Sequence, residues 1–78
     1  MLEIFRALGL VFVIYPDDHD PPHVHLRGAG WEIKVTLDAT PGLAVIRGEV
    51  AHQQARKVLE LVRLHYAALL NAWREIHG

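Results

Sequence analysis

The residues best suited to chemistry lie together in one short acidic and histidine-rich segment. Residues 17–25 read DDHDPPHVH and contain three of the six histidines and three of the nine acidic residues of the chain. A simple turn does not require this composition. The two prolines restrict the backbone further, because a proline ring fixes φ and removes an N–H donor. The segment therefore predicts a stiff loop that gathers polar side chains into a candidate functional site.

The histidines at the end of this segment are compatible with two different chemistries. His23 and His25 alternate with Val24, so a strand would place both rings on one face, with Cβ atoms about 6–7 Å apart. The rings can bind one metal ion, with Asp18 or Asp20 as a further ligand, and this donor set suits zinc, iron or nickel. They can instead flank a phosphate, one as general base and the other as general acid near neutral pH. Spacing alone does not choose between them.

Two basic residues are candidates for binding the phosphate in the second chemistry. Arg27 follows His25 by two positions and is expected on the same face, where a guanidinium can hold a phosphate. Lys34 is expected on the polar face of the next strand. A third interpretation without chemistry also stays open: the loop is only a stiff turn, and the histidines face solvent.

Extended segments must position these groups. They are predicted over residues 2–6, 10–15, 23–27 and 31–37, with a weaker one over 43–47. In residues 10–15, both the odd- and the even-numbered positions are apolar, which predicts a strand covered on both faces. Residues 23–27 and 31–37 alternate between polar and apolar side chains and are expected to form a hairpin around the turn at residues 28–30.

A helix is predicted after this sheet. From about Val50, apolar residues recur at spacings of three and four, so one apolar stripe runs along a helical segment. The helix either continues or breaks near His65 into two shorter ones. Other apolar residues lie outside the stripe and suggest a surface for a partner or a second copy: Ala51, Leu61, Leu64 and Ala68. Trp31 and Trp73 are expected in the core, and His52, His65 and His77 at the surface.

The predicted fold is therefore α+β: a small antiparallel sheet of about four strands packed on a long C-terminal helix, in a single domain over residues 1–78. With 51% hydrophobic residues and a net charge of −1, the chain is neither disordered nor strongly basic. The absence of cysteine excludes disulfides and fits a cytoplasmic location. The apolar run over residues 7–15 is about half the length needed to cross a bilayer, so we expect a buried strand there.

The acidic loop and its Pro-Pro-His-x-His core resemble the signature of a small bacterial family known as domain of unknown function 4160. The resemblance extends along the chain to the late tryptophan of the helix, Trp73. It implies that the chain is similar to the toxin half of a type II toxin–antitoxin pair, of the kind called DhiT, encoded beside a small antitoxin. His23 and His25 match the signature, with Asp18 and Pro22 beside them.

Together, the residues and the resemblance lead us to expect a small toxin, a candidate ribonuclease, that acts on RNA through its histidine face. The expected partners are a cognate antitoxin protein, RNA and a second copy of the chain, with no membrane. The alternative is a non-enzymatic metal- or ligand-binding module that regulates a partner. The assigned residues are the acid–base pair His23 and His25, the substrate-binding Arg27 and Lys34, and the metal ligands Asp18, Asp20, His23 and His25.

Overall fold

The computed structural model describes residues 2–7, 9–38 and 40–77, with only the backbone described for residues 2–5 and 7. Its elements, in chain order, are β1 (Leu2–Ala7), β2 (Leu10–Ile14), β3 (His23–Gly28), β4 (Trp31–Thr36), β5 (Leu43–Arg47), α1 (His52–Leu64) and α2 (Tyr66–His77). The predicted α+β class is confirmed. Each extended segment forms a strand, so the antiparallel sheet has five strands where about four were expected.

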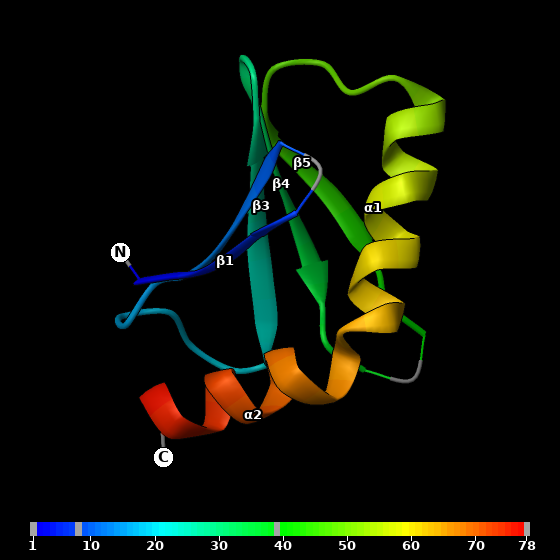
Figure 1. Ribbon diagram of the computed structural model, residues 1–78. Helices are drawn as coiled ribbons and strands as arrows, with labels where there is room; N and C mark the ends of the chain where they lie inside the picture. Colours follow the sequence, from blue (N-terminus) through cyan, green and yellow to red (C-terminus); the bar gives the residue numbers. More distant parts are fainter. Residues whose placement is uncertain (1, 8, 39, 78) are drawn as a thin grey trace.

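The strands form a meander in which each pairs antiparallel with the next, in the order β1-β2-β3-β4-β5. Helix α1 runs alongside this sheet, and α2 crosses the end at which β3 begins (Figure 1). No described helix combines the length and apolarity that a bilayer-spanning segment needs.

The alternation of side chains in β3 and β4 divides the sheet into two faces. Val24 and Leu26 of β3, and Ile33 and Val35 of β4, are fully buried and belong to the core that the helices cover. The polar residues between them, including the histidines, lie on the other face because neighbouring side chains of a strand point in opposite directions. Strand β2 is buried on both faces, as predicted, since its residues 12–14 are all inaccessible to solvent.

The helical segment breaks at His65, which confirms one of the two expected outcomes. The backbone of His65 leaves helical geometry, with φ of −103° and ψ of 17°, while its N–H still donates to the carbonyl of Leu61 at 3.0 Å. The chain then changes direction, so that Leu69 and Trp73 of α2 enter the core. Outside the stripe, Leu64 is 75% exposed, whereas Leu61 packs partly against the core.

Candidate functional site

The loop between β2 and β3 folds back over the beginning of β3. The N–H of Asp18 donates to the carbonyl of Tyr15 at 3.1 Å, which closes a turn directly after β2. At the other end of the loop, the carbonyl of Pro22 accepts a hydrogen bond of 2.8 Å from the N–H of Leu37, just after β4. The loop is therefore fixed at both ends, and the Asp18 side chain lies against the histidines of β3.

Three metal-ligand atoms converge at this place. The Asp18 Oδ2 atom lies 3.0 Å from His23 Nε2 and 3.4 Å from His25 Nε2. All three atoms lie within 4.8 Å of one another. The side chains are largely buried, with 9% of His23, 11% of His25 and 24% of Asp18 exposed. Of the residues that the structure describes, these form the one group of three or more potential ligands at such distances.

The second nitrogen of each imidazole is held by a hydrogen-bond acceptor. His23 Nδ1 lies 2.9 Å from the carbonyl oxygen of Pro21, and His25 Nδ1 lies 3.0 Å from Glu32 Oε2. Neither oxygen can donate while Glu32 is ionised, so each Nδ1 must carry the hydrogen. In a neutral imidazole the lone pair is then on Nε2. With both rings neutral, the two Nε2 lone pairs face the Asp18 carboxylate.

The convergent atoms do not satisfy one another. Asp18 Oδ2 and His25 Nε2 are buried and have no hydrogen-bond partner among the described residues. The distances from Asp18 Oδ2 to both Nε2 atoms are short enough for a hydrogen bond. The angles at which these atoms approach each other are therefore what prevents one. Buried polar atoms without partners are costly, and lone pairs gathered around one point call for a positive charge between them.

Glu32 connects the histidines to a second polar group. Its Oε1 accepts a hydrogen bond of 3.2 Å from Arg27 Nε, and the Tyr15 hydroxyl lies 3.4 Å from its Oε2. Arg27 also donates to the Tyr15 hydroxyl at 2.9 Å. The hydrogen bond to Glu32 raises the pKa of Arg27 above its ordinary value. The Arg27 guanidinium is thus already bound within the protein.

Aromatic rings surround the histidines. The Tyr15 ring meets His25 edge-on at a centroid distance of 4.6 Å. Trp73 of α2 lies 5.0 Å from His23 and also stacks on His77 at 3.7 Å, both measured between ring centroids. Trp73 is in the core, as predicted. His77, expected at the surface, is instead partly buried, because the spacing of four residues in a helix places it over Trp73.

The structure brings together only some of the residues predicted for the site. Asp18, His23 and His25 converge, whereas Asp20 is exposed and lies outside their cluster. Lys34 pairs with His25 across β3 and β4 and is partly buried on the same face. Because Arg27 is bound to Glu32 and Tyr15, the arrangement suits a shared cation better than a phosphate between the two rings.

Sequence reasoning missed Glu32 and Tyr15. The signal for Glu32 was present in the hairpin, because a two-residue turn at residues 29–30 pairs Arg27 with Glu32. That register places Glu32 on the histidine face, two residues before Lys34, the partner of His25. Tyr15 could not be found in this way, since it follows the end of β2 and its side-chain position depends on the loop.

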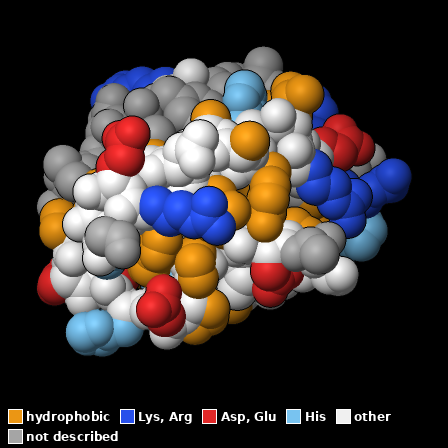
Figure 2. All heavy atoms as spheres, turned by 90° about the horizontal axis from the view of Figure 1, so that it is seen from below, with side chains coloured by type: hydrophobic (Ala, Val, Ile, Leu, Met, Phe, Trp, Pro, Cys, Tyr) orange, Lys and Arg blue, Asp and Glu red, His pale blue; other side chains and the backbone are white. Residues whose placement is uncertain are grey.

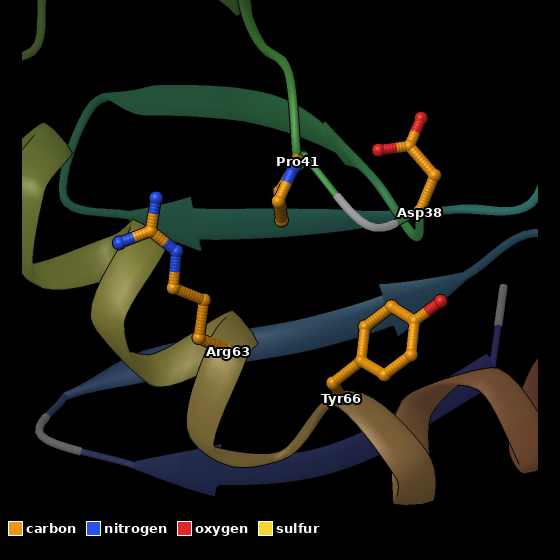
Figure 3. A pocket seen from close by; sticks show the side chains of 4 residues that line it. All are labelled: Asp38, Pro41, Arg63 and Tyr66. Atoms are coloured by element: carbon orange, nitrogen blue, oxygen red, sulfur yellow. The ribbon is translucent and has the colours of Figure 1, made fainter.

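Two surface hollows lie outside this cluster. One, of about 350 Å³, is lined by Arg63 and Tyr66 from the helices and by Asp38 and Pro41 from the loop after β4 (Figure 3). The other, of about 380 Å³, lies between β2 and α1 and is lined by Leu10, Gln54, Lys57, Val58 and Leu61. The face seen in Figure 2 mixes hydrophobic side chains with charges of both signs. None of these surfaces gathers ligand groups as the histidine cluster does.

Comparison with known proteins identifies the family. Residues 9–74 match the family described as Domain of unknown function (DUF4160), and the chain therefore belongs to this family. The matched part contains the acidic loop, both histidines of β3 and Trp73. No curated protein and no solved structure matches the chain.

Proposed function

We propose that this member of the DUF4160 family binds one divalent transition-metal ion through Asp18, His23 and His25. The observation that carries the proposal is the convergence of three buried ligand atoms whose imidazoles are both held through Nδ1. With zinc–nitrogen bonds of about 2.0–2.1 Å, two ligands of a tetrahedral ion lie about 3.3 Å apart. The distances of 3.0 and 3.4 Å from Asp18 to the two rings fit this spacing.

The ligand types narrow the choice of ion. Two imidazoles with one carboxylate suit Zn²⁺, Fe²⁺ or Ni²⁺, whereas Mg²⁺ and Ca²⁺ prefer oxygen ligands throughout. Hydrogen bonds from Nδ1 to a carbonyl or carboxylate are the usual support of a metal-binding histidine, because they fix its tautomer and ring orientation. Three protein ligands leave a coordination position for water or another ligand, as in catalytic zinc sites.

The competing explanation is an ion pair between Asp18 and a protonated histidine. Such a pair would place the carboxylate oxygen in the direction of an imidazole N–H, whereas here neither approach has the geometry of a hydrogen bond. Two ligands of one ion approach each other obliquely, because each points at the ion and not at the other ligand. The oblique approach of these atoms therefore favours metal binding over an ion pair.

Calorimetric titration of metal-depleted protein with Zn²⁺ and Co²⁺ tests the proposal. We expect saturation at one ion per chain, loss of this binding in His23→Ala and Asp18→Asn, and unchanged binding in His52→Ala, whose exposed ring lies on α1. The absence of saturable one-to-one binding in the wild type would overturn the proposal. So would equal binding by His23→Ala and His52→Ala.

For the biological role, we propose the toxin half of a type II toxin–antitoxin pair that acts on RNA through this site in the cytoplasm. The resemblance carried by the Pro-Pro-His-x-His segment, which lies within the family match, is what suggests this role. Lys34, across from His25, is the available cation for a phosphate group. Leu64 is the most exposed large hydrophobic residue of the helices and belongs to the surface proposed for the antitoxin or a second copy.

Induced expression in bacterial cells tests this role. We expect growth arrest with the wild type and with His52→Ala, and normal growth with the double variant His23→Ala/His25→Ala at equal protein levels. Arrest by neither wild type nor control would overturn the toxin role. Arrest by all three proteins would retain the toxin role but would show that the metal site is not its cause.

A further inference from the structure

We infer that Glu32 is a positioning residue of the metal site: its carboxylate holds His25 in the tautomer and orientation that direct Nε2 at the ion. The inference rests on the proposed metal binding and extends it to a residue that does not touch the ion. Glu32 is 8% exposed and comes from β4, the strand next to the histidines. A carboxylate in such a place requires a specific reason, because burying a charge is costly unless it is paired and hydrogen-bonded.

The two carboxylate oxygens of Glu32 have different hydrogen-bond partners. Oε2 faces His25 Nδ1 at 3.0 Å, while Oε1 receives the Arg27 Nε hydrogen at 3.2 Å. Arg27 balances the charge of Glu32 and is itself held by the Tyr15 hydroxyl. Each side chain therefore fixes the next, and the series ends at the nitrogen of His25 that lies opposite the metal-binding one.

The two imidazoles are consequently not equivalent. His23 Nδ1 is held by a neutral carbonyl, that of Pro21, whereas His25 Nδ1 is held by an anion. A carboxylate that accepts the Nδ1 hydrogen increases the basicity of the ring and makes Nε2 a stronger metal ligand. His25 is also the ligand whose Nε2 is buried and unpartnered. The carboxylate of Glu32 therefore increases the basicity of the same ring whose Nε2 has no hydrogen-bond partner.

Glu32→Gln tests this role, with Glu60→Gln on the exposed face of α1 as the matched control. We expect Glu32→Gln to bind Zn²⁺ about 10–100-fold more weakly, the loss typical of removing such a supporting carboxylate. We also expect an altered visible spectrum for bound Co²⁺, which a general loss of stability would not produce. Glu60→Gln should match the wild type in both measurements. Unchanged affinity and spectrum in Glu32→Gln would overturn the inference.

A measurement on the wild type keeps the test independent of whether Glu32→Gln folds. Proton–nitrogen NMR correlation of the histidine rings identifies which nitrogen of His25 carries the hydrogen in zinc-loaded protein. We expect the hydrogen on Nδ1, with His25 Nε2 bound to the ion. A hydrogen on Nε2 of His25 would overturn the inference. Failure of the wild type to bind any ion would instead overturn the proposed function, so the two failures are distinguishable.

Discussion

The indole of Trp73 packs against the imidazole of His23, with ring centroids 5.0 Å apart and the planes inclined by 47°. This contact joins the final helix to the proposed metal site, because His23 Nε2 is one of the convergent ligand atoms. Trp73 is 3% exposed and also belongs to the hydrophobic core. The same side chain therefore contributes to stability and forms one wall of the site.

Trp73 should report metal binding through its fluorescence. In a Trp31→Phe background, Trp73 is the sole tryptophan. We expect Co²⁺ or Ni²⁺ to quench its emission, with saturation at one ion per chain, because the ion would bind next to a ring that Trp73 contacts. Fluorescence titration measures this effect, and adding His23→Ala to the same background should remove the saturable part. Equal quenching with and without His23 would contradict the prediction.

The core contribution of Trp73 predicts a large loss of stability on truncation. Trp73→Ala should lower the free energy of unfolding by about 3–5 kcal/mol, because it removes a large buried side chain and leaves a cavity. Urea denaturation measures the change. The neighbouring exposed residue provides the control, since Arg74→Ala should stay within about 0.5 kcal/mol of the wild type. Similar values for the two variants would mean that α2 does not pack through Trp73.

The acidic loop offers a matched pair of substitutions. Asp18 converges with the histidines, whereas Asp20 is exposed and does not. With free Zn²⁺ at 100 times its dissociation constant, binding should stabilise the wild type by about 2.7 kcal/mol. For a domain of this size that corresponds to a rise in Tm of roughly 10 °C or more. Asp20→Asn should retain the rise and Asp18→Asn should lose it in a thermal melt. Loss of the rise in Asp20→Asn and not in Asp18→Asn would show that Asp20 is the ligand and would contradict the prediction.

Two glycines with similar backbone conformations should differ in their tolerance of alanine. Gly30 and Gly48 have φ of +79° and +77°. A Cβ at Gly30 would meet nothing within 4 Å, whereas one at Gly48 would collide with the carbonyl oxygen of Gly30. Gly30→Ala should therefore lower the free energy of unfolding by about 1–2 kcal/mol, the cost of a left-handed backbone conformation for alanine. Gly48→Ala should lower it clearly more. Urea denaturation of both variants gives the order, and equal losses would show that the collision is relieved by a small shift.

The sheet and the shared face of His23 and His25 could be predicted from the sequence because both depend on local patterns, whereas the sequence left open whether the helix breaks near His65. Alternation over residues 23–27 and 31–37 is sufficient to place His23 and His25 on the face opposite the core. The choice between Asp18 and Asp20 could not be made, since both lie in the same loop and the sequence does not show which side chain the folded loop brings to β3.

The supporting residues depend on contacts between distant segments and were correspondingly harder to predict. Glu32 reads as an ordinary polar residue on an alternating strand, and its role follows only from the register of β3 with β4. Arg27 was predicted to bind substrate, and its hydrogen bonds to Glu32 and Tyr15 do not follow from its pattern in the sequence. The contact of Trp73 with His23 depends on the angle between the two helices, which hydrophobic spacing alone does not determine.

The break at His65 makes the wall behind His23 depend on a contact between segments far apart in the sequence. It directs α2 to the end of the sheet, where Trp73 forms the wall behind His23. The hairpin of β3 and β4 pairs segments that are close in sequence, whereas contacts between segments far apart in sequence form more slowly. Asp18, His23 and His25 can all be in place while this wall is still missing, because Trp73 belongs to a different segment of the chain. Completion of the site therefore depends on the packing of α2 against the sheet.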